Sequence, residues 1–239
     1  ARKPDGSPSF EIEDFRNITE AILGAVDDVV INYSTGAIGI PIQKRIDYLR
    51  EMRPDVAALN MGSMNYAKYS PRRKEYVFDF VFENPFKDIC FLLSVMKEAK
   101  VKPELECFDL GHTASIVPLL DQGLLTEPLQ FSFIMGVLGG IRATAENLAA
   151  QAREARALSR DPAWEVIGIS HEQWTMLAAA LSLGGNVRVG LEDNFYLDAA
   201  GKQMARSNGD LVAKAVRMAR DAGREPANVD EARALLSLR

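Results

Sequence analysis

The chain has 239 residues, of which 47% are hydrophobic and 26% are charged, an ordinary composition for one globular domain or two small ones. Its formal net charge of −5 argues against a nucleic acid or an anionic membrane as a partner held by bulk electrostatics. No apolar run is long enough to span a bilayer, and no secretory signal is visible. Cys90 and Cys107 indicate reduced thiols and not a disulfide framework, so we expect a cytoplasmic protein.

Strands and helices alternate along the chain in the predicted order. A helix is predicted first, over residues 12–26. The predicted strands cover residues 28–34, 56–62, 103–108, 129–135, 164–169 and 187–192. The helices predicted between and after them cover residues 42–51, 85–98, 114–122, 144–159, 172–183, 210–222 and 230–237. Several of these strands are nearly continuous in apolar residues, which is typical of parallel strands covered on both faces.

This alternation indicates either a doubly wound sheet or a (β/α)8 barrel. Polar residues or glycines follow almost every predicted strand, whereas a doubly wound sheet would gather them at one switch point. We therefore predict a (β/α)8 TIM barrel, an α/β fold, in a single domain over residues 1–239. Because only six strands are predicted and a helix comes first, we expect the first strands of the barrel to lie before Ala1.

The last predicted strand, 187–192, ends in charged residues and is followed by Asp193 and Asn194. Side chains alternate along a strand, so Arg188 and Glu192 should point to the same side with only a glycine between them. A cation and two acids in this place suggest a polar site. A surface ion pair that caps the strand is an equally good interpretation of the segment alone.

Glu104 and Glu106 lie two residues apart in a strand that is otherwise predicted to be buried. Burying two acids is costly unless each of them is paired or hydrogen-bonded. We therefore interpret these glutamates as part of a functional site. Arg188 is the cationic partner that we expect for them.

Two further strand ends and one loop carry candidate binding residues. Ser34, Thr35 and Gly36 supply hydroxyls and flexible backbone amides that could hold a carboxylate, although a helix-capping turn is equally possible. Asn60 could donate its amide to an anionic oxygen, or it could stabilise a turn. The glycine-rich loop 136–140 could fold over a long cofactor arm, but such a loop is more often a tight connection.

The two histidines and one basic cluster are predicted to have structural or surface roles. His112 and His171 each follow a strand end, and neither has a partner at the spacing of a metal site. We interpret them as surface or supporting residues. The cluster Arg72-Arg73-Lys74 is predicted to lie on a solvated face.

Several motifs, taken in order, make the sequence similar to a known family. They are Asp5-Gly6-Ser7-Pro8-Ser9, Ser34-Thr35-Gly36, Leu59-Asn60-Met61-Gly62-Ser63, Pro103-Glu104-Leu105-Glu106 and Arg188-Val189-Gly190-Leu191-Glu192-Asp193-Asn194. Each motif is weak alone, but their order and spacing are specific. Over essentially its whole length the chain resembles the β-keto acid cleavage enzymes, whose founding activity is 3-keto-5-aminohexanoate cleavage in lysine fermentation.

The resemblance implies a (β/α)8 barrel that holds a divalent metal, usually zinc, by a His-x-His motif and a glutamate. Glu192 would be that glutamate, and both histidines would lie before Ala1. Glu106, Arg188 and Asp193 would be the catalytic residues. The substrate's carboxylate end would bind among Ser34, Gly36, Ala37, Ala58 and Asn60. The family often has glycine and threonine where this chain has the two alanines, which implies a different substrate pocket.

The implied reaction joins a β-keto acid with acetyl-CoA and yields acetoacetate and a shorter acyl-CoA. The metal would stabilise an enolate, Asp193 would be the base, Arg188 would screen the developing charge, and Glu106 would orient Arg188 or relay a proton. One alternative is a CoA-independent, metal-dependent aldolase or lyase on the same barrel. Another is a non-catalytic barrel that binds a carboxylic acid. The resemblance further implies a homo-oligomer, a tetramer.

Overall fold

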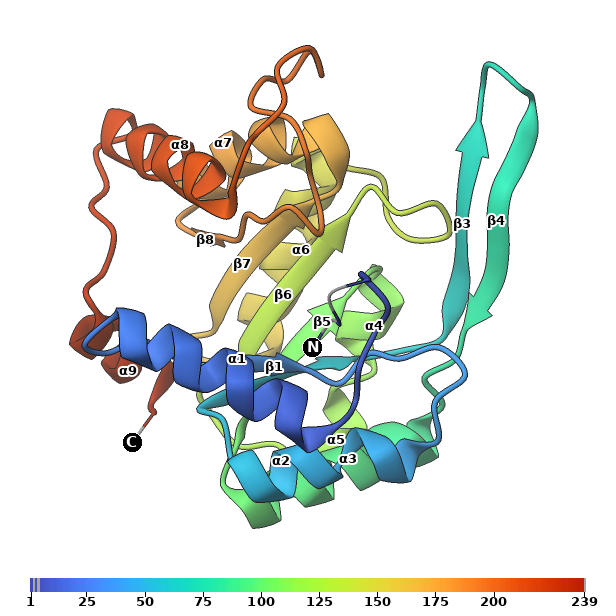
Figure 1. Cartoon of the computed structure of the whole chain (residues 1–239), viewed down its shortest axis with the longest axis vertical. Helices are drawn as coiled ribbons and strands as arrows, with labels where there is room; N and C mark the ends of the chain where they lie inside the picture. Colours follow the sequence, from blue (N-terminus) through green and yellow to red (C-terminus); the bar gives the residue numbers. More distant parts are fainter. Residues whose placement is uncertain (2, 4, 239) are drawn as a thin grey trace.

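The computed structural model describes residue 1, residue 3 and residues 5–238, and its centre is a curled sheet of parallel strands (Figure 1). The strand order is β1-β2-β5-β6-β7-β8, and each neighbouring pair is parallel. The strands are β1 (Asn32–Ser34), β2 (Val56–Asn60), β5 (Lys102–Cys107), β6 (Gln130–Met135), β7 (Ala163–Gly168) and β8 (Asn186–Val187). The prediction of an α/β fold on a parallel sheet is confirmed. A closed barrel in one domain stays a prediction, because the described strands form an open sheet.

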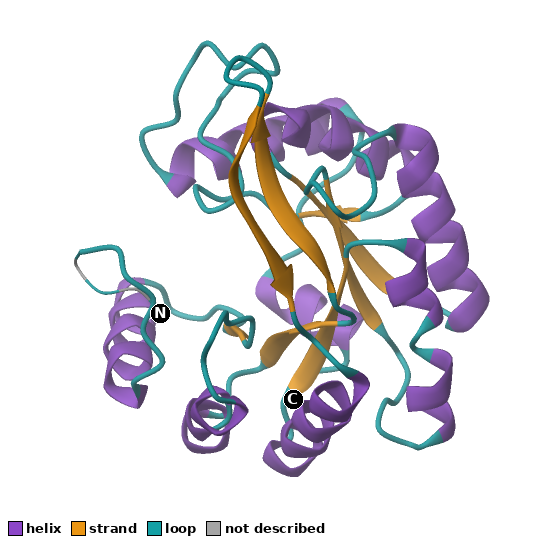
Figure 2. Cartoon of the chain, turned by 90° about the vertical axis from the view of Figure 1, so that its right-hand side faces the viewer, coloured by secondary structure: helices purple, strands orange, loops and turns teal. Residues whose placement is uncertain are grey.

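Helices connect the strands and cover the outer face of the sheet (Figure 2). They are α1 (Ile12–Ala25), α2 (Asp47–Met52), α3 (Phe86–Ala99), α4 (Leu110–Ala114), α5 (Val117–Asp121), α6 (Ala145–Leu158), α7 (Gln173–Leu183), α8 (Asn208–Asp221) and α9 (Val229–Leu236). The short 3-10 helices η1 (Ile42–Arg45) and η2 (Ser170–Glu172) precede α2 and α7. None of the described helices is long and apolar enough to cross a membrane.

Alternation along each strand gives the sheet one apolar face and one polar face. In β5, Leu105 and Cys107 are fully buried in the main hydrophobic core, whereas Glu104 and Glu106 point to the inner face. The same core contains Tyr33, Leu59, Phe131, Phe133, Trp164 and Val166 from the other strands. Burying each large apolar side chain stabilises the fold by about 1.5–3 kcal/mol. The apolar face therefore holds the sheet to its helices and leaves the inner face free for polar side chains.

A long antiparallel hairpin, β3 (Met64–Ser70) and β4 (Glu75–Phe82), follows β2 and is missing from the predicted elements. It stands beside the carboxyl ends of the parallel strands, away from the covering helices (Figures 1 and 2). Both of its faces carry aromatic residues, so its sequence lacks the simple apolar–polar alternation of a half-buried strand. The basic cluster 72–74 lies at its turn and is exposed, which confirms the prediction of a solvated face.

The prediction of a strand over residues 187–192 is wrong for most of its length, because β8 ends at Val187. The chain turns after it, and the N–H groups of Asp193 and Asn194 donate to the carbonyl oxygen of Gly190 at 3.1 and 3.0 Å. The first strand is also shorter than predicted, since only Asn32–Ser34 pairs with β2. Alternation in a sequence does not reveal whether a neighbouring strand is there to pair with.

Candidate active site

A single guanidinium lies among several carboxyl groups on the inner face of the sheet. The Arg188 nitrogens are 3.9 Å from Glu104, 3.6 Å from Glu106, 3.5 Å from Glu192 and 3.8 Å from Asp193. The Glu104 side chain is only 2% exposed, whereas that of Glu192 is 70% exposed. The expected pairing of Arg188 with the two glutamates of β5 is confirmed. The cluster thus extends from a buried floor to an open rim.

Strand pairing and one turn bring these side chains together. The N–H of Arg188 donates to the carbonyl oxygen of Val166 at 3.1 Å, which continues the parallel pairing of β7 and β8 by one residue. The turn after Gly190 then brings Glu192 and Asp193 back toward the guanidinium. Arg188 and Glu192 therefore meet as predicted, but a turn brings them together and not the shared face of a strand.

Glu165 is a further acid of this cluster that sequence analysis does not single out. It lies opposite Ser132 in the register of β6 and β7, and Ser132 lies opposite Glu106 in β5. The Ser132 hydroxyl donates to a Glu165 carboxyl oxygen at 3.1 Å. The only signal in the sequence is one acid at an inward position of an apolar strand, and nothing near it suggests a partner.

Burial shifts the pKa values of these acids upward. It raises the pKa of Glu106 to about 8, and the negative charge of Glu104 adds to the shift while Arg188 opposes it. It also raises the pKa of Glu165 to about 8, again with a contribution from Glu104. The pKa of Asp193 rises to about 6, because burial outweighs the attraction of Arg188. Near neutral pH, Glu106 and Glu165 are therefore carboxylic acids and can donate hydrogen bonds.

Two buried carboxyl oxygens of the cluster have no hydrogen-bond partner among the described residues, Oε1 of Glu104 and Oδ2 of Asp193. The other oxygen of Glu104 accepts from the amides of Asn32 and, at 3.4 Å, of Gln130. Buried polar groups in proteins are almost always hydrogen-bonded, so unused acceptors in a cluster mark a place where a ligand or a proton can be received. Both oxygens face the Arg188 guanidinium only at ion-pair distances of 3.9 and 3.8 Å, so each can still accept a hydrogen bond from a ligand.

A second polar group adjoins the acids. The N–H of Gly36 donates to the Ser34 hydroxyl at 3.2 Å, and a side-chain carbon placed on Gly36 would lie 3.0 Å from the amide nitrogen of Asn60. Asn60 lies opposite Glu106 in the strand register, and Ala58 lies between Ser34 and Glu104. These candidate binding residues therefore share the inner face with the acids.

The loop after β1 is held in place from the outer side of the sheet. The Thr35 hydroxyl donates to the carbonyl oxygen of Ala58 at 2.7 Å, and Tyr48 donates to that of Ser34 at 2.7 Å. Arg45 donates to the carbonyl oxygen of Thr35 at 2.8 Å. Ala37 follows Gly36 in this loop and is half-buried. The loop is thus fixed, and Gly36 can stay close to Asn60.

The glycine-rich loop 136–140 packs against the hairpin. The N–H of Ala67 donates to the carbonyl oxygen of Leu138 at 3.2 Å. A side-chain carbon on Gly139 would lie 1.8 Å from the carbonyl oxygen of Asn65, so only glycine allows this approach. The interpretation of the loop as a structural connection is the better one, because it holds β3 beside the site.

Tyr66, on β3, is another residue that sequence analysis does not identify. Burial raises the pKa of its phenol, and the negative charges of Asp193, Glu192 and Glu106 raise it further. This effect needs the phenol to lie near Glu192 and Asp193, which we call the rim acids. No local sequence pattern reveals this proximity, because Tyr66 is far from Glu192 and Asp193 in the sequence and the hairpin brings it to them.

The described residues do not assemble a metal centre. They contain no group of three or more histidine, cysteine, aspartate or glutamate side chains arranged to hold a metal ion. His112 is buried against Gly62, accepts the N–H of Phe108 at 3.3 Å, and has its pKa lowered by burial. The rim glutamate Glu192 is a single potential ligand, whereas catalytic zinc usually has three from the protein.

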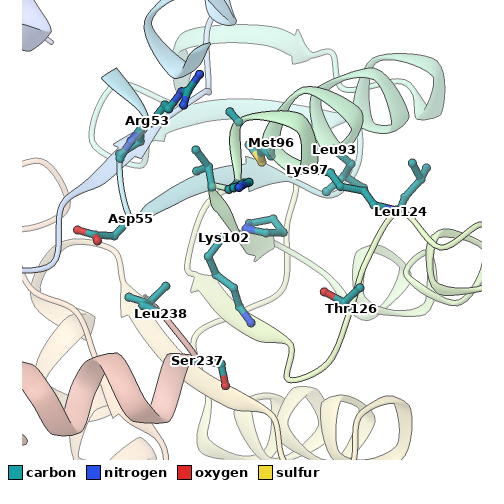
Figure 3. A pocket seen from close by; sticks show the side chains of 15 residues that line it. Arg53, Asp55, Leu93, Met96, Lys97, Lys102, Leu124, Thr126, Ser237 and Leu238 are labelled. Atoms are coloured by element: carbon teal, nitrogen blue, oxygen red, sulfur yellow. The ribbon is translucent and has the colours of Figure 1, made fainter. Parts of the chain in front are cut away.

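A cavity of about 590 Å³ lies at the other end of the strands, near the amino ends of β2 and β5 (Figure 3). Lys97 and Lys102 line it, and each donates to a backbone carbonyl oxygen, those of Gly123 and Pro128. Asp55 also lines it and is paired with Arg233 at 2.7 Å. This cavity does not contribute to the acid cluster.

Fold and site together define a class: α/β proteins with an acid-rich polar site on the inner face of a curled parallel sheet. The model of the beta-keto acid cleavage enzyme family matches residues 1–238, and the chain belongs to this family. It is 36% identical over 239 residues to a 3-keto-5-aminohexanoate cleavage enzyme of Fusobacterium nucleatum. The match covers 100% of this chain and 81% of that protein.

Other relatives agree with this assignment. A 3-oxoadipate:acetyl-CoA acetyltransferase of Cupriavidus necator is 34% identical over 237 residues, covering 99% of this chain and 78% of that protein. The solved apo structure of ObcA is similar with a TM-score of 0.80 at 16% identity, which concerns the fold alone. The match covers 96% of this chain and spans 55% of that chain's length.

Proposed function

We propose that the protein cleaves a β-keto acid with acetyl-CoA as the second substrate, releasing acetoacetate and an acyl-CoA. In this exchange the acyl group on the keto side moves to CoA, and the acetyl group joins the remaining carboxymethyl carbon. Family membership and the names of the relatives support this reaction. The observation that carries the proposal is Arg188, held 3.6 Å from Glu106 and 3.8 Å from Asp193.

The roles of the three residues follow from their chemistry. Asp193, at the rim, removes the proton between the keto and carboxylate groups of the substrate. Arg188 stabilises the negative charge that then develops, as a fixed cation does best in a partly buried site. Glu106, which is protonated near neutral pH, orients Arg188 or passes a proton to the departing carbanion.

The substrate's carboxylate binds at the polar group beside the acids. Ser34 supplies a hydroxyl, Gly36 leaves space and Asn60 supplies an amide. Ala37 and Ala58 are small, so they set the width of the pocket. The proximity of Gly36 to Asn60 supports this assignment.

Zinc or another divalent metal is the cofactor that the resemblance implies, and Glu192 is our proposed ligand for it. One exposed carboxylate is not a metal site, so the described residues do not fit the cofactor by themselves. The roles above therefore rest on the side chains alone. A closed barrel, a single domain, a cytoplasmic location and a tetramer belong to the same proposal.

The test is Asp193→Asn, which keeps the shape of the side chain and removes the base. Acetoacetate release from a series of β-keto acids is measured with and without acetyl-CoA. We expect the variant to lose turnover by about 100-fold or more, as for removal of a general base. Asp221→Asn, on the exposed end of α8, is the control.

The outcomes separate the alternatives. Acetyl-CoA-dependent release that Asp193→Asn abolishes supports the proposal. Equal turnover by the variant would remove Asp193 from the role of base. Cleavage without acetyl-CoA would indicate an aldolase or lyase, and binding without any turnover would indicate a carboxylic acid carrier.

A further inference from the structure

One face of the β3–β4 hairpin carries a continuous ridge of aromatic rings. Cross-strand partners share a face, and here Tyr66 pairs with Phe80 and Lys68 pairs with Phe78. The ring centres of Tyr66 and Phe80 are 5.3 Å apart, and those of Phe78 and Phe80 are 5.9 Å apart. We call Tyr66, Phe78, Phe80 and Phe82 the aromatic ridge.

The ridge begins at the candidate active site. The ring centres of Phe82 and Tyr66 lie 6.3 and 6.4 Å from the ring centre of Phe108. Phe108 directly follows β5 and its acids. Phe82 also lies 3.7 Å from the position of a side-chain carbon on Gly36. The inner end of the ridge therefore adjoins both the acids and the carboxylate-binding group.

The outer end of the ridge is exposed and basic. Phe78 is 41% exposed, although large aromatic rings are usually covered. Lys68 lies beside it, and Arg72 and Lys74 follow at the hairpin turn. Among the described residues, none of these three cations has a carboxylate within ion-pair distance. This concentration of positive charge stands out in a chain with a net charge of −5.

The length of the ridge suits an extended ligand. It runs from Phe82 to Phe78 along β4. A strand rises about 3.3 Å per residue, so the ridge is roughly 13 Å long, and the hairpin turn lies beyond it. A ligand that reaches from the acids to the turn needs a reactive end, a long arm, and a ring with negative charge at the far end.

We propose that the aromatic ridge and the basic turn bind the nucleotide end of acetyl-CoA, a proposal that rests on the proposed function. The adenine stacks on Phe78 and Phe80, and the phosphates lie against Lys68 and Arg72. The pantetheine arm then runs along Tyr66 and brings the thioester to Arg188. Aromatic faces and nearby cations are the combination that proteins use to hold nucleotides.

The test compares two thioesters that differ only in the nucleotide, acetyl-CoA and acetyl-pantetheine. For Phe78→Ala and for Lys68→Ala/Arg72→Ala, we expect kcat/KM with acetyl-CoA to fall about tenfold, in line with the loss of one stacked base or of phosphate contacts. The loss with acetyl-pantetheine should be less than about twofold. Val81→Ala, on the opposite face of the hairpin, and Lys87→Ala, on α3, are the matched controls.

Binding of the nucleotide alone makes the test independent of turnover. Calorimetry with 3′-phosphoadenosine 5′-diphosphate should show binding to the wild type and to the controls, and binding about tenfold weaker for the ridge variants. If the wild type binds this nucleotide but forms no acetoacetate, the proposed function fails and the nucleotide site stands.

Other outcomes would overturn the nucleotide site. Equal losses with both thioesters would show that the ridge does not contact the nucleotide. The ridge variants could instead differ from the wild type in particle mass by light scattering and lose activity equally with both thioesters. That result would show that a second copy of the chain covers the ridge.

Discussion

At the scale of single residues, Arg188 is the centre of the site. It faces Glu104, Glu106 and the rim acids, and their charges keep its pKa high although burial lowers it. One cation cannot neutralise all of these acids, so some of them hold protons. The site thus combines a fixed positive charge with neutral carboxylic acids near neutral pH, as proton transfer to and from carbon requires.

Gly36 gives a prediction at the same scale. In Gly36→Ala the new methyl group would lie 3.0 Å from the Asn60 amide nitrogen and displace it by a few tenths of an ångström. We expect the KM for the β-keto acid to rise about fivefold, the equivalent of about 1 kcal/mol of hydrogen bonding. Steady-state kinetics and thermal melting measure this effect.

The control for Gly36 is Gly24→Ala in α1, where an added methyl group meets no atom within 4 Å. Its KM should equal that of the wild type. Should Gly36→Ala also bind substrate normally, the loop after β1 would lie outside the carboxylate site.

At the scale of elements, the hairpin depends on its contact with the glycine-rich loop. Gly139 has a φ of 108°, and alanine there would bring its methyl carbon to 1.8 Å from the Asn65 carbonyl oxygen. We expect Gly139→Ala to separate the loop from β3. Trypsin should then cleave after Arg72 and Arg73 faster than in the wild type, and the melting temperature should fall.

Gly123→Ala is the matched control for this prediction. Its φ of 64° is also positive, but an added methyl group meets no atom within 4 Å. It should suffer only the backbone strain, about 1–2 kcal/mol, and keep the wild-type cleavage rate at the hairpin turn. Equal cleavage rates in both variants would show that the loop does not hold the hairpin.

At the scale of the whole molecule, burial of acids couples stability to pH. The pKa of Glu165 is about 8 in the folded protein, against an ordinary value of 4.5, so the folded state holds more protons than the unfolded state between these values. The stabilisation is complete below pH 4.5 and is lost as the pH rises through 8. Glu106 acts in the same direction.

We therefore expect the free energy of unfolding to fall between pH 5 and 8, by on the order of 1 kcal/mol per pH unit. Urea unfolding at a series of pH values measures this slope. Glu165→Gln should reduce it, whereas Glu20→Gln on the exposed face of α1 should leave it unchanged. A wild-type curve without slope over this range would contradict the assigned pKa values.

The sequence predicts those parts of the fold that depend on local patterns. Strands β6 and β7 are recognised because apolar residues dominate their sequences. The pairing of Arg188 with Glu104 is recognised because buried acids need a cation. Glu165 is missed because one acid in an apolar strand has no visible partner.

Parts that depend on distant contacts are not predicted. The end of β8 at Val187 depends on whether a neighbour pairs with the following residues. The hairpin depends on its packing against the glycine-rich loop, and Tyr66 reaches the rim acids only through the hairpin. No local pattern encodes these contacts. The site residues on the strands of the sheet are therefore predicted better than those on the hairpin and in the turn after β8.

The two-faced alternation of β5 has a consequence for how this protein can change over time. Deleting one residue from this strand would turn its carboxylates toward the helices and its apolar side chains toward the substrate. Both the hydrophobic core and the active site would then be lost. The length of this strand is thus fixed by both of its faces at once.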